Sequence, residues 1–241
     1  MLAGRRPVVE LLRAGGVAER ILVARDRGRA GTLDEIRRRA SAAGIPVRFV
    51  PSTELDRLAP DLHHQGVVAL TGRFRYRPID DLFPSGSVLF LDGVTDPHNL
   101  GSLLRSAECA GFGGVVVPAR RAAAVTPTVR RVSAGAAELV PVARVTNLAR
   151  ALDAARAAGL WVAGLDQNAV ESLWTSDLIE PPLALVVGSE DRGISRNVRE
   201  RCDGLVSIPQ SGRMPSLNVA VAGAIAMFEV ARRKLSQGAE S

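Results

Sequence analysis

Three short polar stretches, each at the end of an apolar run, carry the side chains of this sequence that could do chemistry. They are DPHNLGSLLR at 96–105, VVGSEDRGIS at 186–195 and IPQSGRMPSLN at 208–218. Their amide, guanidinium, carboxylate and hydroxyl groups can orient a bound substrate and stabilise charge that develops on it. They offer no Ser-His-Asp triad and no carboxylate pair, so they do not indicate a hydrolase that works through such groups.

Five side chains in these stretches are the candidate site residues: Asn99, Arg105, Glu190, Ser216 and Asn218. Each also has an ordinary structural explanation. Asn99 could cap a helix, Arg105 could lie on a solvated helix face, and Glu190 could offset a helix dipole. Ser216 or Asn218 could cap the last helix. One stretch alone is weak evidence, but three of them at strand ends of one sheet predict a single pocket.

The elements that must position these side chains alternate regularly from residue 87 onward. Apolar runs predict buried strands at 87–94, 114–118, 161–166, 183–188 and 204–209. Helical patterns separate most of them, at 99–110, 128–137, 147–158, 194–201 and 217–234. This alternation predicts an α/β fold with a mainly parallel sheet that helices cover on both faces. Ligands of such sheets bind beyond the carboxyl ends of the strands, which is where the three stretches lie.

The last helix is apolar on every side from Val219 to Val230, so we expect it to pack inside the protein. Backbone N–H groups near Ile208 and at the start of this helix could hold a small ligand, and Gly188 would let one approach the chain closely. The stretch AGFGGVV at 110–116 is not a dinucleotide-binding fingerprint, because it follows a helix and precedes a strand.

Before residue 87 the pattern predicts a compact α/β domain at 1–72 and a linker at 73–86, followed by the larger domain at 87–241. In the first domain, the longest helical pattern places one apolar face at Leu33, Ile36 and Ala40. A second helix, STELDRL, is expected to begin with a Ser or Thr cap. The linker carries arginines and aromatic residues that could stack on unpaired RNA bases, although it could equally be a plain tether.

The net charge of +6 is unevenly distributed along the chain. Residues 1–77 contain 15 Arg against 8 Asp and Glu, whereas residues 78–241 contain 16 Lys and Arg against 17 Asp and Glu. A basic module of this kind suggests a polyanionic partner, with RNA or DNA first. The alternative is a compositional bias from a GC-rich coding sequence, because Lys234 is the one lysine beside 30 arginines.

The two cysteines, Cys109 and Cys202, lie far apart and show no metal-site spacing, so we expect reduced core residues, a cytoplasmic protein and no metal. No apolar run is long enough to predict a membrane span. The N-terminus lacks the apolar segment of a secretory signal.

Taken together, the motifs DPHNLGSLLRSAECAG, VVGSEDRGIS and IPQSGRMPSLNVAVAGAIAMFE resemble the SpoU or TrmH-like branch of the SPOUT RNA methyltransferases. The first domain, which ends in HHQGVVAL, resembles the small L30e-like RNA-recognition domain that precedes the catalytic domain in many members. The chain looks most similar to the 23S rRNA guanosine-2′-O-methyltransferases. The resemblance covers about 150 residues of the second domain, in line with the usual size of one catalytic domain.

The resemblance implies that S-adenosylmethionine is the methyl donor and that the ribose 2′-OH of RNA is the acceptor. It also implies an obligate homodimer and a C-terminal trefoil knot. It assigns functional roles to Asn99, Arg105, Glu190, Ser216 and Asn218. It implies that the backbone around Gly188, Ile208 and Leu217 holds the cofactor, and that the loop at 209–218 wraps it. One departure is Asp191, where many members have Gly.

Four alternatives stay open from the sequence. The substrate could be a tRNA instead of rRNA, or the enzyme could be an rRNA methyltransferase of the resistance type. The protein could bind RNA without catalysis, or it could be a nucleotide-dependent α/β enzyme such as a dehydrogenase. For catalysis, our hypothesis is that Arg105 binds the phosphate next to the target ribose and stabilises the developing alkoxide.

Overall fold

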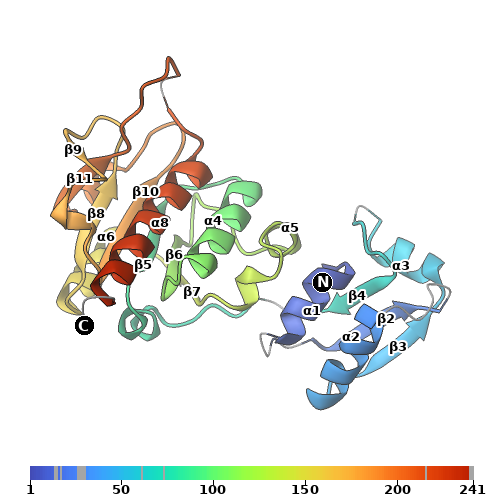
Figure 1. Ribbon diagram of the computed structural model, residues 1–241. Helices are drawn as coiled ribbons and strands as arrows, with labels where there is room; N and C mark the ends of the chain where they lie inside the picture. Colours follow the sequence, from blue (N-terminus) through green and yellow to red (C-terminus); the bar gives the residue numbers. More distant parts are fainter. Residues whose placement is uncertain are drawn as a thin grey trace. The chain divides into compact units, whose positions relative to one another are not determined.

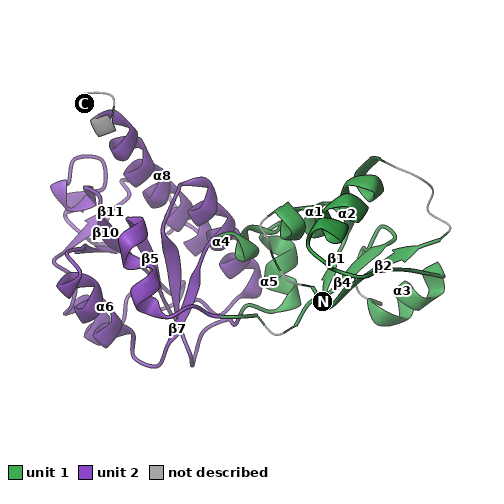
Figure 2. Ribbon diagram, turned by 90° about the horizontal axis from the view of Figure 1, so that it is seen from below, with its two compact units in different colours: residues 1–75, 125–139 green, residues 76–124, 140–241 purple. Residues whose placement is uncertain are grey.

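The computed structural model describes residues 1–13, 16, 18–25, 31–60, 62–72, 74–214 and 216–238. Arg73 of the predicted linker and Pro215 of the third polar stretch lie outside these residues. The chain divides into two compact units, which have different colours in Figure 2. Unit 1 consists of residues 1–75 and 125–139, and unit 2 of residues 76–124 and 140–241.

Unit 1 contains a four-stranded sheet in the order β1-β4-β2-β3, in which β2 and β3 are parallel and β4 is antiparallel to β1 and β2. Its elements are β1 (Leu2–Ala3), α1 (Arg5–Arg13), β2 (Arg20–Ala24), α2 (Gly31–Ala42), β3 (Val47–Val50), α3 (Ser52–Leu58), β4 (Val67–Leu70), α5 (Pro127–Val132) and the 3₁₀ helix η3 (Ala136–Glu138). The predicted apolar face of α2 is confirmed, because its three residues are buried. The predicted Ser or Thr cap of α3 is wrong, because Pro51 holds that position and makes no side-chain cap bond.

The predicted linker is packed against both units. Within unit 1, the Arg130 guanidinium lies 5.7 Å from the centroid of the Phe74 ring. Within unit 2, the Arg144 guanidinium lies 5.6 Å from the centroid of the Tyr76 ring. Two 3₁₀ helices follow, η1 (Ile79–Asp81) and η2 (Phe83–Ser85), and they bring buried apolar side chains to the core of unit 2, namely Leu82 and Phe83.

Unit 2 is built on a seven-stranded sheet in the order β7-β6-β5-β10-β8-β11-β9, and every neighbouring pair is parallel. The strands are β5 (Val88–Asp92), β6 (Gly114–Pro118), β7 (Val142–Val145), β8 (Trp161–Leu165), β9 (Glu171–Ser172), β10 (Leu183–Gly188) and β11 (Gly204–Ser207). The predicted α/β fold with a mainly parallel sheet is confirmed. β7 and β9 lie at the two edges and were not predicted, because they are short and carry exposed polar residues.

Helices cover both faces of this sheet. On one face lie α4 (Pro97–Cys109) and α8 (Val219–Gly238), which run side by side in Figure 1. They touch closely at Gly223, where an added Cβ would lie 2.5 Å from Cδ2 of Leu103. The other face is covered by α6 (Leu148–Ala157) and α7 (Arg196–Arg199), with η1 and η2, around a core that includes Phe90 and Val186.

The expectation that α8 packs inside the protein is met on one side of the helix. Val221 is 48% exposed, Phe228 50% and Leu235 76%. These residues recur every seventh position, so they form one stripe along the helix. The opposite side is buried against α4 and β10. A sequence that is apolar on every side predicts that all sides of a helix are buried, but it does not distinguish burial by the same chain from burial by a partner.

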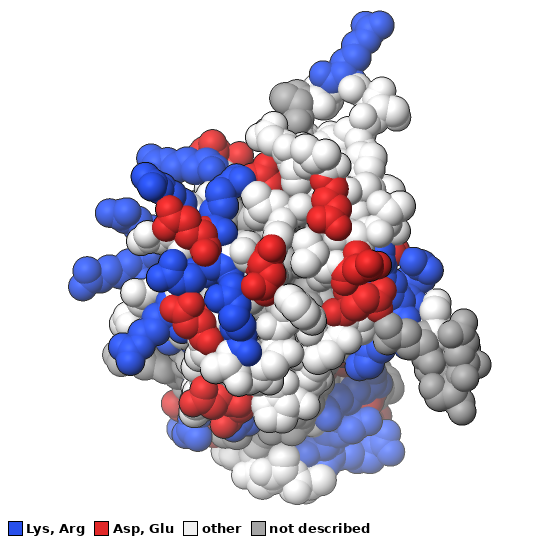
Figure 3. All heavy atoms as spheres, turned by 90° about the vertical axis from the view of Figure 1, so that its left-hand side faces the viewer, with Lys and Arg blue, Asp and Glu red and all other residues white. Residues whose placement is uncertain are grey.

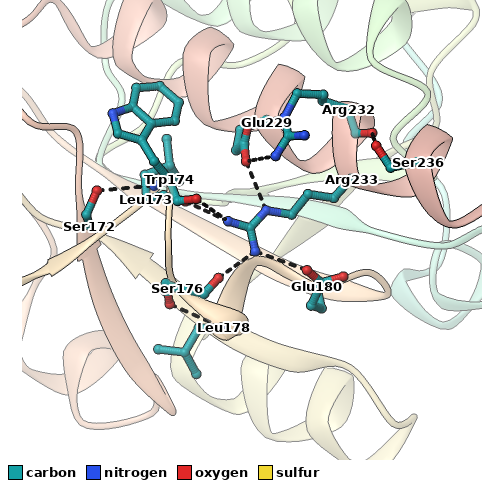
Figure 4. A network of polar contacts seen from close by, with 10 residues as sticks. All are labelled: Ser172, Leu173, Trp174, Ser176, Leu178, Glu180, Glu229, Arg232, Arg233 and Ser236. Atoms are coloured by element: carbon teal, nitrogen blue, oxygen red, sulfur yellow. Dashed lines mark hydrogen bonds and ion pairs between the residues drawn. The ribbon is translucent and has the colours of Figure 1, made fainter.

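Arg233 fixes the second half of α8 to the segment between β9 and β10, which contains the 3₁₀ helix η4 (Asp177–Ile179) (Figure 4). Its guanidinium is buried and uses all five N–H donors. The acceptors are Glu229 at 2.9 Å, Glu180 at 3.0 Å and the carbonyl oxygens of Ser176 at 2.6 Å, Leu173 at 3.1 Å and Trp174 at 3.0 Å. Hydrogen bonds from Arg232 and Arg233 lower the pKa of Glu229, although burial opposes this shift.

Candidate active site

The central pair of strands, β5 and β10, marks the point where the order of the sheet reverses. From β5 the chain builds β6 and β7 on one side, and it then places β8, β11 and β9 beyond β10 on the other. Loops at the carboxyl ends of two such strands diverge and leave a crevice in which α/β proteins bind ligands. Asp92 and Gly188 are paired at the ends of β5 and β10, so the first two polar stretches begin at this crevice.

Three of the five predicted site residues meet there in a closed set of hydrogen bonds. Asn99 donates from Nδ2 to Oε1 of Glu190 at 2.6 Å, and Asn218 donates from Nδ2 to the same oxygen at 2.9 Å. Asn218 also donates to Oδ1 of Asn99 at 3.1 Å. The three polar stretches are therefore joined side chain to side chain, as one pocket requires. We call this set the Asn-Glu-Asn triangle.

The start of α4 explains why the Asn99 side chain is free to join the triangle and does not cap the helix. Asp96, not Asn99, caps this helix, because its side chain accepts from the N–H of His98 at 2.9 Å. Pro97 follows at the first helical position, where its missing N–H costs nothing. The alternative explanation of Asn99 as a helix cap is thus wrong. Asn99 is a buried residue, with a relative exposure of 9%, and its side chain belongs to the Asn-Glu-Asn triangle.

Asn218 serves two purposes at once. Its Oδ1 caps α8 by accepting from the N–H groups of Ala220 at 2.9 Å and Val221 at 3.3 Å. Its Nδ2 is left to bind Glu190 and Asn99. Because the cap fixes which end of the amide carries oxygen, the nitrogen can face only the triangle.

Glu190 is held by a tight turn after β10. Ser189 and Gly193 exchange two backbone hydrogen bonds, at 3.0 and 2.9 Å. An added Cβ on Gly188 would lie 2.1 Å from the carbonyl carbon of Gly193 and 2.3 Å from the nitrogen of Ile194. No side chain fits at Gly188, so glycine is required for the turn to close over the end of the strand.

A cavity of about 280 Å³ opens at the carboxyl ends of β8, β10 and β11. All three predicted cofactor positions, Gly188, Ile208 and Leu217, line it, and so do Glu190 and Ser216. Its apolar lining suits a flat heterocycle, and its polar lining suits sugar hydroxyl and amino-acid groups. The apolar residues are Leu165, Val187, Ile208, Leu217, Val219 and Ala222, and the polar ones include Asp166, Gln167, Asn168, Ser189, Gln210 and Ser216. These donors fit a nucleoside-amino acid conjugate such as S-adenosylmethionine.

A second cavity of about 600 Å³ adjoins the first and shares Glu190 and the rest of its turn, residues 189–193. Asn99 lines it as well. It extends to the loops after β6 and β7, where Arg120, Arg121 and Asn147 are found. The sequence did not single out these residues, although the same strand-end rule applied to PARR after β6 and VTN after β7 would have found them.

Arg105 is not part of either cavity lining. It is exposed on α4, six residues after Asn99, which corresponds to about 9 Å along the helix and about 240° around it. The structure thus brings together Asn99, Glu190 and Asn218, places Ser216 in the smaller cavity, and leaves Arg105 outside.

The two cysteines have free thiols, but the expectation that both are core residues is wrong for Cys109, which is exposed at the end of α4. Cys202 is partly buried, and burial with the nearby Asp203 carboxylate raises the pKa of its thiol to about 11. Burial and the neighbouring Glu108 also raise the pKa of Cys109. Both are therefore poor nucleophiles near neutral pH.

Comparison with protein families decides which class of enzyme this is. Residues 86–228 match the SpoU rRNA Methylase family, and residues 1–77 match the family described as RNA 2′-O ribose methyltransferase substrate binding. This chain belongs to the SpoU rRNA methylase family. The resemblance carried by the three motifs is therefore confirmed.

Relatives of this SpoU family member match nearly its whole length. A Bacillus subtilis (strain 168) protein assigned to the TrmH family of tRNA/rRNA methyltransferases, YacO, is 40% identical over 96% of this chain and 94% of its own. The crystal structure of the SpoU methyltransferase AviRb from Streptomyces viridochromogenes with AdoMet matches with a TM-score of 0.77 and 27% identity, over 98% of this chain and 90% of that one. The AdoMet-bound rRNA methyltransferase from Sinorhizobium meliloti matches with a TM-score of 0.80 and 27% identity, over 97% and 86%.

The SpoU protein is accordingly an RNA 2′-O-ribose methyltransferase whose methyl donor is S-adenosylmethionine. This sets aside the alternatives of a non-catalytic RNA-binding protein and of a dehydrogenase. Among the residues that the structure describes, no helix has the length and apolar character needed to cross a bilayer.

Proposed function

We propose that this SpoU enzyme methylates the ribose 2′-hydroxyl of a guanosine in 23S rRNA. The observation that carries this proposal is the Asn-Glu-Asn triangle, which lies where the cofactor-sized cavity adjoins the larger one. A donor in the first cavity and a ribose in the second would meet at Glu190. Methyl transfer needs the acceptor oxygen at about 3 Å from the methyl carbon, so this placement supplies much of the rate.

Each residue of the site has a separate task in this proposal. S-adenosylmethionine, when bound, supplies an electrophilic methyl group on a positively charged sulfur. The backbone around Gly188, Ile208 and Leu217 holds that molecule. The hydrogen bonds of the triangle use one of the two amide N–H groups of Asn99 and one of the two carboxylate oxygens of Glu190. The second N–H and the second oxygen orient the ribose hydroxyls.

The Ser216 hydroxyl lines the smaller cavity and adds a further donor and acceptor near the reacting groups. The target hydroxyl must also lose its proton during transfer. Using an arginine as the base near pH 7 would cost roughly 7 kcal/mol for its own deprotonation. Arg105 is therefore assigned to the phosphate beside the target ribose, where its charge stabilises the developing alkoxide.

The uncovered stripe of α8 supports a homodimer. Val221, Phe228 and Leu235 are between 48% and 76% exposed, and an apolar stripe of this length needs a partner surface. Arg105 faces away from the cavities of its own chain, so we assign it to the site of the second copy. The proposal also includes a trefoil knot, which the loop at 209–218 forms. It places the enzyme in the cytoplasm, together with its RNA substrate.

The mapped identity of the methylated nucleotide tests the RNA target. RNA extracted from a strain that lacks this protein is incubated with the enzyme and labelled S-adenosylmethionine, and rRNA and tRNA are then separated. We expect the label in 23S rRNA, at a single guanosine. Label confined to tRNA would contradict the rRNA assignment without affecting the enzyme class.

Transfer RNA is the second candidate, because the curated relatives carry the combined description tRNA/rRNA methyltransferase. The share of this chain that each solved structure matches favours rRNA as the substrate. The structure that describes 2′-OH methylation of C/U34 on tRNA matches 62% of this chain, whereas the Sinorhizobium rRNA methyltransferase matches 97% and thus includes unit 1.

A further inference from the structure

A further polar cavity lies in unit 1. It measures about 530 Å³ and is formed by Asp56 of α3, the loop between α3 and β4 and the first residue of α1. The residues that line it are Arg5, Asp56, Ala59, Pro60, Leu62, His63, His64 and Gln65. It combines an apolar wall with cationic, anionic, amide and imidazole groups, which is the mixture that binding sites for small polar ligands show.

The floor of this cavity is rigid because His64 is buried and bonded at both ring nitrogens. Its Nδ1 accepts from the N–H of Gly66 at 3.0 Å. Its Nε2 lies 2.9 Å from Oδ1 of Asp56. A nitrogen that accepts carries no hydrogen, so the neutral ring holds its proton on Nε2 and donates it to Asp56. One oxygen of this exposed carboxylate is thereby committed, and the other has no hydrogen-bond partner among the residues that the structure describes.

The rim of the cavity is strained. Gln65 has a φ of 49°, a left-handed conformation that residues other than glycine rarely adopt. Arg5 clamps it on both sides, since Nε donates to the carbonyl oxygen of Gln65 at 3.2 Å and the backbone N–H of Arg5 donates to its Oε1 at 3.4 Å. Strain that the surrounding structure maintains in this way is typical of ligand-binding segments.

We infer that this cavity binds one unpaired nucleotide of the substrate RNA, other than the nucleotide that is methylated. The base packs against Pro60 and Leu62 with the exposed ring of His63 stacked on it, and Asp56 accepts from an amino group of the base. Arg5 contacts the adjacent phosphate. This inference rests on the proposed function, because it needs RNA as the substrate.

Two features favour RNA over another ligand of similar polarity. Residues 1–77 match the substrate-binding family of RNA 2′-O ribose methyltransferases, and they carry 15 Arg against 8 Asp and Glu. Unpaired bases are the part of RNA that proteins recognise by stacking on rings and by hydrogen bonds to base edges. Duplex RNA presents no separated base and could not enter a cavity of this size.

The test compares full-length variants in fluorescence anisotropy with two probes, a labelled 20-nucleotide single-stranded RNA of random sequence and a labelled 20-base-pair RNA duplex. His63→Ala removes the exposed ring, and Arg5→Ala removes the phosphate contact. Arg6→Ala is the matched control, because it removes the same charge at the neighbouring exposed position, which does not line the cavity. Melting curves and calorimetric binding of S-adenosylmethionine confirm that each variant is folded and that unit 2 is intact.

We expect His63→Ala and Arg5→Ala to bind the single strand about tenfold more weakly, as the loss of one stacked base or one phosphate contact predicts, while Arg6→Ala changes the Kd less than about twofold. The duplex should show no such difference. If the wild-type enzyme methylates RNA but His63→Ala and Arg6→Ala bind the single strand equally well, the cavity is not an RNA site. If the wild-type enzyme transfers no label to any RNA, the proposed function and this inference fail together.

Discussion

Nδ2 of Asn218 lies 2.9 Å from Oε1 of Glu190, which links the residue before α8 to the turn after β10. The same nitrogen lies 3.1 Å from Oδ1 of Asn99, 119 residues earlier in the chain. Three loops from different parts of the sequence are thereby fixed to one carboxylate. A change in any of the three side chains should disturb the positions of the other two.

Asn218→Asp tests this link without removing the cap of α8, because Asp also caps helices well. The new carboxylate would face Glu190 at hydrogen-bond distance, so like charges replace an attractive contact. We expect S-adenosylmethionine to bind at least about tenfold more weakly in calorimetry, with a nearly unchanged melting temperature.

The double variant Glu190→Gln with Asn218→Asp is the matched control, since it exchanges the amide and the carboxylate across the same contact. Binding should recover in part. Equal losses in the single and double variants would show that the Asn218–Glu190 contact does not position the cofactor site.

Gly188→Ala tests the space at the end of β10. The new Cβ would collide with backbone atoms of Gly193 and Ile194, which cannot move without opening the turn that holds Glu190. We expect a loss of about 1–3 kcal/mol in the free energy of unfolding and loss of cofactor binding. Gly212→Ala is the control, because nothing lies within 4 Å of its added Cβ. Denaturant titration of both variants would refute the steric argument if their stabilities were equal.

Phe228→Glu tests the proposed dimer surface on α8. A carboxylate in the middle of an apolar interface would be left without water or a partner, so the Kd for dimerisation should rise at least about 100-fold. Light scattering coupled to size exclusion measures the mass in solution. Val170→Glu introduces the same group at a fully exposed position outside α8 and should leave the mass unchanged. A wild-type protein that is monomeric at high concentration would contradict the dimer itself.

The assignment of Arg105 to the second copy predicts complementation. Asn99→Ala and Arg105→Ala homodimers should each be nearly inactive. When the two are unfolded together and refolded as a mixture, half of the dimers are mixed and each has one intact site, so about 25% of wild-type activity should return. If Arg105 serves its own chain, every site in the mixture lacks one of the two residues and no activity returns.

The sequence predicted some strands to the residue, placed some of the site residues together and missed other elements. Continuous apolar runs identified β10 and β6 to the residue, because strands buried on both faces leave little ambiguity. The strand-end rule placed Asn99 and Glu190 in one crevice, since carboxyl ends of parallel strands share one edge of the sheet. β7 was missed because it has four residues and includes the exposed Arg144.

Other features depend on contacts that a pattern does not encode. Periodicity could not tell that Val221 and Phe228 are uncovered in one chain, because burial by a partner and burial by the same chain select the same residues. It also could not tell that Asp96 rather than Asn99 caps α4, since both residue types favour that position. The family motif led us to expect Arg105 in the pocket, although its spacing of six residues from Asn99 already predicts that the two side chains lie on different sides of one helix.

Cys202 gives a pH dependence with a defined sign. Its thiol pKa is raised from 9.0 to about 11 in the folded state, chiefly by burial, so the folded protein holds this proton more tightly than the unfolded chain. The stabilisation from this group is fully present below pH 9 and is lost as the pH rises through 11, amounting to about 3 kcal/mol. Denaturant titrations at pH 7.5 and 10.5 should show a smaller decline for Cys202→Ala than for the wild type. Identical declines would contradict the raised pKa.

The charged surface elsewhere on unit 2 limits where RNA can bind. Basic and acidic groups are intermixed on the face shown in Figure 3. Four exposed arginines of α6, α7 and their neighbourhood are in ion pairs: Arg156 with Asp203, Arg196 with Glu200, Arg199 with Asp166 and Arg201 with Asp153. The arginines at the larger cavity, Arg120, Arg121 and Arg192, have no such partner among the described residues, so RNA is expected to approach on the side of the crevice.

The atom that receives the methyl group tests the central claim most directly. RNA methylated by the pure enzyme with labelled S-adenosylmethionine is digested to nucleosides and separated by chromatography with mass detection. The site described above predicts that all label appears in a 2′-O-methylated nucleoside, with loss of the label in Asn99→Ala. Label on a base, or undiminished transfer by Asn99→Ala, would contradict the assignment of the crevice between β5 and β10 as a ribose methylation site.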